Sequence, residues 1–124
     1  METIEKAKML FNILNERKAV DPVLIEVTGI TSIADYFIIA SGSSTRQVQA
    51  ITRHLEKRMR EAGIKPLGIE GEQNAQWVLM DYGDVIIHIF YEDVRKFYDL
   101  EGLWVDAPRL EAKDLDQSTS LEKA

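Results

Sequence analysis

Hydrophobic residues recur every three or four positions in two stretches of the chain, which is the spacing of one face of an α-helix. In residues 3–18 this face is formed by Ile4, Ala7, Phe11 and Leu14. The second stretch follows Ser41-Gly42-Ser43-Ser44, which provides a turn and a helix N-cap, and it ends at Gly63; its apolar positions are Val48, Ile51, Leu55, Met59 and Ala62. The pattern predicts two amphipathic helices.

Two shorter apolar runs between these helices predict β-strands. Asp21-Pro22 ends the first helix, and residues 23–27 are apolar and rich in β-branched side chains. Residues 36–40 are apolar throughout, which is typical of a strand buried on both faces. We therefore expect this second strand to lie near the centre of a sheet.

Residues 77–81 and 85–90 are two further strand-like runs, and Gly83 between them suits a tight hairpin because glycine adopts positive φ. A two-residue turn at Gly83-Asp84 would pair side chains on one face: Trp77 with Phe90, Leu79 with His88, and Asp81 with Ile86. The other face is almost wholly apolar and is expected to pack on the helices: Val78, Met80, Tyr82, Val85, Ile87 and Ile89.

The face that carries Trp77, Asp81 and His88 would then turn outward. Aromatic side chains with a polar margin are typical of a protein-binding surface. The alternative is a second core layer beneath a helix, and the pattern alone favours neither interpretation.

The rest of the chain completes a single α/β domain. Residues 68–74 are polar and contain glycine, which predicts a loop, while residues 92–98 predict a short helix and residues 100–105 carry further large apolar side chains. We expect one domain at residues 1–108, with a mixed sheet and a central hairpin flanked by helices. Residues 109–124 are mostly polar and predict a flexible tail.

Composition narrows the classes of partner. The 124 residues include 15 Lys and Arg against 21 Asp and Glu, a net charge of −6. This balance argues against DNA, because phosphate-backbone binding needs cations, and it favours a basic protein. There is no cysteine, and the two histidines lie far apart, so we expect no metal and no cofactor. No apolar run approaches the roughly 20 residues that span a bilayer, so we expect a cytoplasmic protein without membrane contact.

A nucleotide-binding enzyme is one alternative. Ser41-Gly42-Ser43 could cradle a phosphate before a helix, as the Gly-Ser pair of a nucleotidyltransferase does. Such an enzyme also needs two metal-binding carboxylates at the end of the next strand. The available pairs are Glu70 with Glu72 in the predicted loop and Asp114 with Asp116 in the predicted tail. Neither pair is well placed, so a helix cap is favoured and no catalytic residue is assigned.

An RNA-binding module is the other alternative. The second helix carries basic side chains on a broadly common face away from its apolar stripe: Arg46, Arg53, Lys57 and Arg60. Glu56 and Glu61 on the same helix balance part of this charge. In a chain this acidic, a solvated helix face is favoured, and RNA contact is expected to be secondary at most.

Five stretches combine into a specific pattern: TSIADYFIIASG at residues 31–42, STRQV at 44–48, PLGIEG at 66–71, WVLMDYGDVIIH at 77–88 and RKFYDLEGLW at 95–104. Each stretch alone is weak, but a Trp-to-His hairpin followed by Arg-x-Phe-Tyr-x-Leu-Glu-x-Leu-Trp is a distinctive combination. In order and spacing, residues 3–108 resemble the ribosomal silencing factor family, also called RsfS or Iojap.

The resemblance implies a nucleotidyltransferase-like fold without catalytic carboxylates, and a function that is not enzymatic. It implies that the protein binds ribosomal protein fourteen of the large ribosomal subunit, sterically blocks joining of the small subunit, and represses translation when nutrients are scarce. It also implies a homodimer in the free state. By position, the residues it assigns to the partner are Trp77, Asp81, His88, Arg95 and Tyr98, with Glu70, Glu101 and Trp104 as further candidates.

Overall fold

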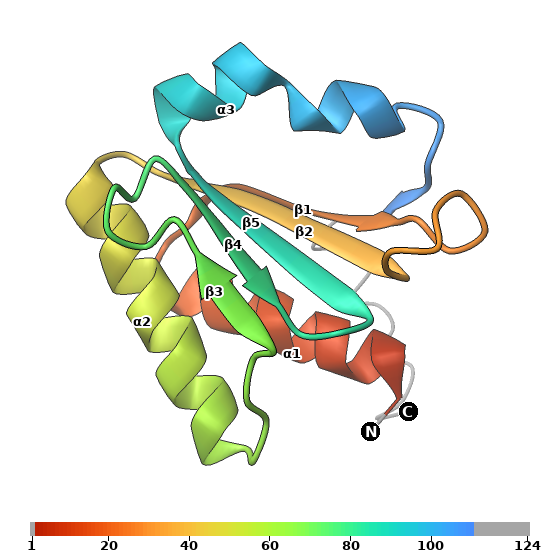
Figure 1. Ribbon diagram of the computed structural model, residues 1–124, viewed down its shortest axis with the longest axis horizontal. Coiled ribbons are helices and arrows are strands. Elements are labelled where there is room, and N and C mark those ends of the chain that lie inside the picture. Colours follow the sequence, from red (N-terminus) through yellow and green to blue (C-terminus); the bar gives the residue numbers. More distant parts are fainter. Residues whose placement is uncertain (1, 111–124) are drawn as a thin grey trace, which may run out of the picture.

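The computed structural model describes residues 2–110 and shows a six-stranded mixed sheet with helices on both faces (Figure 1). The strand order is β3-β4-β5-β2-β1-β6, in which β2 and β5 are parallel and all other neighbours are antiparallel. The elements are α1 (Thr3–Glu16), β1 (Val20–Glu26), β2 (Tyr36–Gly42), α2 (Thr45–Glu61), β3 (Gly68–Glu70), β4 (Trp77–Asp81), β5 (Val85–Tyr91), α3 (Glu92–Tyr98), the 3₁₀ helix η1 (Leu100–Trp104) and β6 (Arg109–Leu110).

This architecture confirms the expected α/β fold with a mixed sheet, a hairpin and flanking helices. Strand β2 lies between β5 and β1 and is buried from Phe37 to Gly42, as its apolar sequence predicts. Ser44 is the N-cap of α2, and its side chain accepts a hydrogen bond from the Gln47 amide. Helix α3 occupies the predicted residues.

Three local expectations are wrong. The predicted loop at residues 68–74 begins with the edge strand β3, which pairs with β4 and packs Ile69 against the core. Ala62 is exposed, because α2 ends at Glu61 and Ala62 is only its C-cap. Asp21 and Pro22 lie within β1, where they form a bulge opposite β2, rather than in a break before the strand.

The expected domain boundary at residue 108 is followed by two more residues of the sheet. Arg109 and Leu110 form β6 and pair with Ile25 and Leu24 of β1. The remainder of the expected tail, residues 111–124, lies outside the described residues. None of the helices within residues 2–110 combines the length and the apolar character that a bilayer crossing requires.

The core consists of two layers, one on each face of the sheet. The larger layer lies between the sheet and helices α1 and α2, and it contains all six residues predicted for the apolar hairpin face. The smaller layer lies on the opposite face, beneath α3 and η1 (Figure 1), and is built around Ile25, Phe37, Ile39, Ile86 and Phe90. Because both faces are covered, every residue of β5 from Val85 to Phe90 is buried.

The hairpin turn is tied to the first helix by a polar cluster. Lys6 donates a hydrogen bond of 2.9 Å to the Tyr82 carbonyl and forms an ion pair with Asp84, to which the Thr3 hydroxyl also donates. Burial alone would raise the pKa of Asp84, but the hydrogen bonds from Lys6 and Thr3 outweigh it and lower the pKa below its ordinary value of 3.8.

We expect Asp84→Asn to lower the free energy of unfolding by about 1 kcal/mol at neutral pH. A carboxyl whose pKa is lowered on folding stabilises the fold above its unfolded pKa and loses that effect as the pH falls through the folded value. The difference in the free energy of unfolding between wild type and variant, measured with urea, should therefore be constant above pH 5 and shrink below about pH 4. The exposed Asp106→Asn, which lies outside this cluster, is the matched control and should leave the free energy of unfolding at neutral pH nearly unchanged. A constant Asp84 difference down to pH 2 would contradict the ion pair.

Candidate functional site

The hairpin has the predicted register, but its outer face is not free. Trp77 pairs with Phe90, Leu79 with His88, and Asp81 with Ile86. On this face Phe90 is 0% exposed, His88 6% and Ile86 8%, because α3 and η1 cross over them. The expectation that His88 faces outward is therefore wrong, and the alternative of a second core layer holds for the middle of the hairpin.

Trp77 links this buried layer to α3. Its indole Nε1 donates a hydrogen bond of 3.0 Å to His88 Nδ1, and its ring lies 4.9 Å from the ring of Phe90 and 5.0 Å from that of Tyr98. Trp77 is half-buried, and it is neither a free surface residue nor a core residue. It forms a platform on which the exposed Tyr98 rests.

His88 is held in its neutral form. Burial lowers the pKa of His88 from its ordinary value of 6.5 to about 4. Because Nδ1 accepts the bond from Trp77, the ring proton resides on Nε2, for which the described residues offer no hydrogen-bond acceptor. A protonated ring would lose the Trp77 bond and would bury a charge.

Helices α3 and η1 expose large apolar side chains on their outer side. Phe97 is 82% exposed, Leu103 74% and Tyr98 55%, and Val105, the C-cap of η1, is 72% exposed, while no residue of either helix is fully buried. The ring of Tyr98 lies 5.0 Å from that of Trp77 and 5.1 Å from that of Phe97, and we call these three residues, together with Leu103 and Val105 of the following segment, the docking face. Exposed apolar side chains gathered on one surface are typical of a protein-binding site.

The family pattern identified only Trp77 and Tyr98 of this docking face. The sequence signal for Phe97, Leu103 and Val105 was present in the large apolar residues that follow the hairpin. A pattern of residue types does not show on which side of so short a helix the core lies.

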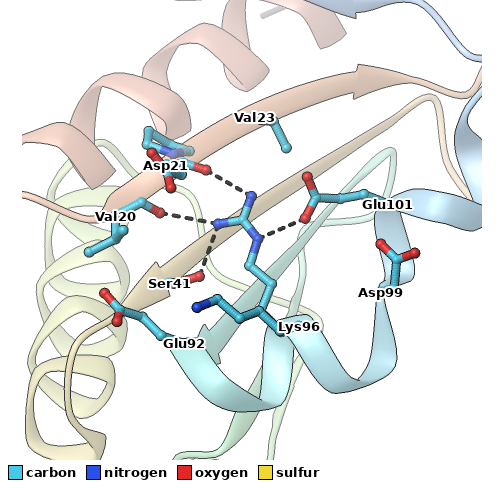
Figure 2. A pocket seen from close by; sticks show the side chains of 10 residues that line it. Val20, Asp21, Val23, Ser41, Glu92, Lys96, Asp99 and Glu101 are labelled. Atoms are coloured by element: carbon cyan, nitrogen blue, oxygen red, sulfur yellow. Dashed lines mark hydrogen bonds and ion pairs between the residues drawn. The ribbon is translucent and has the colours of Figure 1, made fainter.

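Arg95, expected at the partner interface, points inward. Its side chain is 12% exposed and its guanidinium is surrounded by acceptors from β1, β2 and η1 (Figure 2). Nε donates to Glu101 Oε1 at 2.7 Å, so Glu101 is also engaged within the protein. These two expected contact residues lie at the side of α3 that faces the sheet.

The other expected site residues are spread around the hairpin. Trp104 is half-buried, with its ring 5.2 Å from that of Phe37 beneath η1. Asp81 is half-buried, and its Oδ1 accepts a hydrogen bond of 2.8 Å from the Gly83 amide, which closes the turn. Glu70 is exposed on the edge strand β3 and lines a shallow depression with Gly71, Trp77 and Leu79.

The geometry of the Gly-Ser turn fits a helix cap. The amide and the hydroxyl of Ser43 both donate to Gln47 Oε1, at 2.5 and 2.7 Å, so the groups that would cradle a phosphate are already engaged. Glu70 and Glu72 lie beyond this turn, at and after the edge strand, and Asp114 and Asp116 lie outside the described residues. Within residues 2–110 no three His, Asp or Glu side chains come together as a metal site.

Two of the four basic residues named on this face of α2, Arg53 and Arg60, form ion pairs with carboxylates. Arg60 pairs with Glu56 at 2.8 Å, Arg58 pairs with Glu16 of α1, and Arg53 lies 3.8 Å from Glu72. His54 also bonds Glu16, at 2.8 Å. These pairs fit the interpretation as a solvated helix face better than a dedicated RNA-binding surface.

Comparison with known proteins settles the family. The model of the family described as "Ribosomal silencing factor during starvation" matches residues 1–124. The chain belongs to the ribosomal silencing factor family. It is 43% identical over 111 residues to ribosomal silencing factor RsfS of Halalkalibacterium halodurans, covering 90% of this chain and 95% of that protein. It is 45% identical over 94 residues to RsfS of Bacillus subtilis, covering 76% of this chain and 80% of that protein.

A crystal structure of a Chromobacterium violaceum protein, 36% identical, superposes with a TM-score of 0.81 and covers 84% of this chain and 87% of that one. The α/β domain described above is therefore the fold of a solved relative. The protein has the function of a ribosomal silencing factor, and its family consists of ribosome-binding regulators that are not enzymes. Family membership implies binding to the large ribosomal subunit.

Gly71 lies directly against the backbone of Trp77, at the edge of the docking face. A Cβ at Gly71 would lie 2.2 Å from the Trp77 carbonyl oxygen, and its φ is +81°, whereas Gly63 has φ +82° and no atom within 4 Å of such a Cβ. Gly63→Ala should lower the free energy of unfolding by about 1 kcal/mol, because alanine disfavours this positive φ. Gly71→Ala should cost clearly more in urea unfolding and should shift the fluorescence of Trp77 in a Trp104→Phe background. An equal loss of unfolding free energy in the two variants would contradict the close approach of Gly71 to the Trp77 carbonyl.

The buried His88 should make stability depend on pH in a defined direction. Above pH 6.5 it contributes no dependence, and from pH 6.5 down to about 4 the free energy of unfolding should fall, because only the unfolded state binds the proton. The slope from His88 should approach about 1.4 kcal/mol per pH unit, and the slope of His88→Gln should be smaller than that of the wild type by this amount. A midpoint near 4 is expected for His88 in an NMR titration. A midpoint near 6.5 would show instead that the ring is accessible to solvent.

Proposed function

We propose that this chain silences ribosomes by binding ribosomal protein fourteen of the large subunit through the docking face. A domain bound there occupies the space that the small subunit needs, so translation is repressed without any chemical step when nutrients are limited. Membership of the silencing factor family supports the target, and the position of the exposed apolar side chains supports the choice of face.

The observation that carries this proposal is the imbalance between the two sides of α3 and η1. Their inner side contributes only half-buried contacts, from Val94, Leu100 and Trp104, while Phe97 and Leu103 are more than 70% exposed on the outer side. Exposed aromatic and aliphatic side chains of this size lose contact with water only when a partner covers them. A protein partner with matching apolar pockets is the simplest occupant.

Charge supports a basic partner. The net charge of the chain is −6, and α3 with its C-cap, which carries part of the docking face, also carries the carboxylates of Glu92, Asp93 and Asp99. Complementary charge mainly speeds the encounter and orients the partners, while the apolar contacts hold the complex together. An acidic protein with an apolar face therefore suits a basic ribosomal protein.

The expected contact residues take different roles in this proposal. Tyr98 and Trp77 touch the partner, and Glu70 and Asp81 flank the contact. His88, Arg95, Glu101 and Trp104 act from beneath by shaping the surface, because they are buried or engaged inside the protein.

We infer three further properties that rest on the family resemblance. The protein is cytoplasmic, its fold is related to that of nucleotidyltransferases without their catalytic carboxylates, and the free protein is a homodimer. A dimer that uses the docking face would protect the exposed side chains of Phe97 and Leu103 while no ribosome is bound.

Two leucines of equal type and similar exposure provide a matched test. Leu103 is 74% exposed on the docking face, and Leu67 is 77% exposed before β3 and is not part of that face. Leu103→Asp should weaken binding to isolated ribosomal protein fourteen at least tenfold, about 1.4 kcal/mol, and should restore the joined ribosome fraction in sedimentation of purified subunits. Leu67→Asp should bind and silence like the wild type.

The outcomes of this test separate the competing functions. Silencing that survives Leu103→Asp would show that the docking face is not the binding surface. Binding to protein-free ribosomal RNA that falls steeply with salt and is lost in Arg53→Ala would favour the RNA-binding alternative. Unchanged ribosome joining at equimolar wild-type protein would contradict the mechanism as a whole.

A further inference from the structure

The guanidinium of Arg95 bonds to three other elements, of which β1 and β2 are distant in sequence and η1 follows α3 directly. Nη1 donates to Ser41 Oγ of β2 at 2.9 Å and to the Val20 carbonyl of β1 at 3.2 Å. Nη2 donates to the Asp21 carbonyl at 2.9 Å, and Nε donates to Glu101 of η1 at 2.7 Å (Figure 2). One side chain of α3 therefore joins two strands and the following 3₁₀ helix.

The backbone of β1 is distorted where it receives this arginine. Val20 pairs with Ser41 and Val23 pairs with Ile39, so that Asp21 and Pro22 together oppose the single residue between those partners. Asp21 has φ +45°, a conformation that costs a non-glycine residue about 1 kcal/mol or more. The bulge leaves the Val20 and Asp21 carbonyls free to accept hydrogen bonds from Arg95.

The same arginine spans the bend between α3 and η1. Asp99 stands at this bend with φ +46° and ψ +51°, as the C-cap of α3 and the N-cap of η1. Arg95 lies before the bend and Glu101 after it, so their ion pair connects the two helices across the bend. Val94, Leu100 and Trp104 pack these two helices on the sheet without being fully buried, and Arg95 adds directional polar contacts to this packing.

We propose that Arg95 is a positioning residue, which holds α3 and η1 at the orientation that forms the docking face and does not itself touch the ribosomal partner. This inference rests on the proposed function for its consequence in binding, but the positioning itself is a property of the free protein. An arginine is required because its planar group donates in several directions at once, whereas a lysine ammonium is a compact charge on a flexible stem.

The direct test is hydrogen exchange in the free, full-length chain. Arg95→Ala should speed the exchange of amides in residues 92–104 at least tenfold and leave β2 and β5 protected, because the segment is released while the sheet stays folded. Lys96→Ala removes the same charge from the neighbouring residue, which is exposed, and should leave this exchange unchanged. Arg95→Lys should recover less than half of the lost protection on a logarithmic scale. Wild-type exchange in Arg95→Ala, or full recovery with lysine, would overturn the proposal.

Ser41 provides a second variant that cannot act through partner contact. It is 2% exposed in β2, and its hydroxyl accepts one of the four bonds from Arg95. Ser41→Ala should raise exchange in residues 92–104 severalfold and weaken binding to ribosomal protein fourteen, yet add nothing in the Arg95→Ala background. Additive losses of binding would show that Arg95 contacts the partner directly. If Arg95→Ala proves too unstable to study, Ser41→Ala and Glu101→Gln test the same positioning.

The positioning role of Arg95 and the docking face can be refuted separately. Faster exchange without any effect of the Leu103→Asp substitution on binding would retain the positioning role and refute the docking face. Loss of binding in Arg95→Ala with unchanged exchange in residues 92–104 would refute the positioning role and leave the docking face in place.

Discussion

The fold depends on a central pair of parallel strands that is buried on both faces. Strand β5 has alternating side chains that all need cover, with Ile87 and Ile89 on one face and Ile86 and Phe90 on the other. Helices α1 and α2, of 14 and 17 residues, cover the first face. The second face receives only a seven-residue helix and a five-residue 3₁₀ helix. Helices this short cover the sheet with only a few inward side chains. Their large outward side chains, such as Phe97 and Leu103, stay exposed and form the docking face.

A polar pair within this thin second layer defines its shape. An apolar pair in place of Trp77 and His88 would allow several ring orientations, because dispersion contacts have little directional preference. The hydrogen bond from the indole to His88 Nδ1 fixes the plane of Trp77, and Tyr98 rests against that plane. Burial of the imidazole has a cost, because its Nε2 proton finds no acceptor among the described residues. The hydrogen bond that accompanies this cost gives Trp77 and Tyr98 above it a single orientation.

The sequence predicted those parts of the fold that local chemistry determines. The two-residue turn at Gly83-Asp84 set the hairpin register, the apolar run of β2 indicated a central strand, and Ser44 marked the start of α2. It failed where distant elements decide the outcome. Alternation along β5 separates two faces but does not show that His88 will be covered, because the cover comes from residues after the strand. The inward turn of Arg95 depends on a bulge in β1 more than 70 residues away.

The residues assigned by family pattern and the residues exposed on the docking face overlap only in part, and the reason is physical. Contacts run from Arg95 to Glu101, from Trp77 to His88 and from Trp104 to Phe37, and all of them lie under the surface. Such residues require particular side chains, because hydrogen-bond geometry and ring packing tolerate little change, whereas an outer apolar position such as Phe97 or Val105 needs only size and hydrophobicity. A pattern of specific residue types therefore marks the underside of this surface more clearly than the surface itself. It follows that lost binding after substitution of Trp77 would not identify a contact, since the same change removes the support of Tyr98.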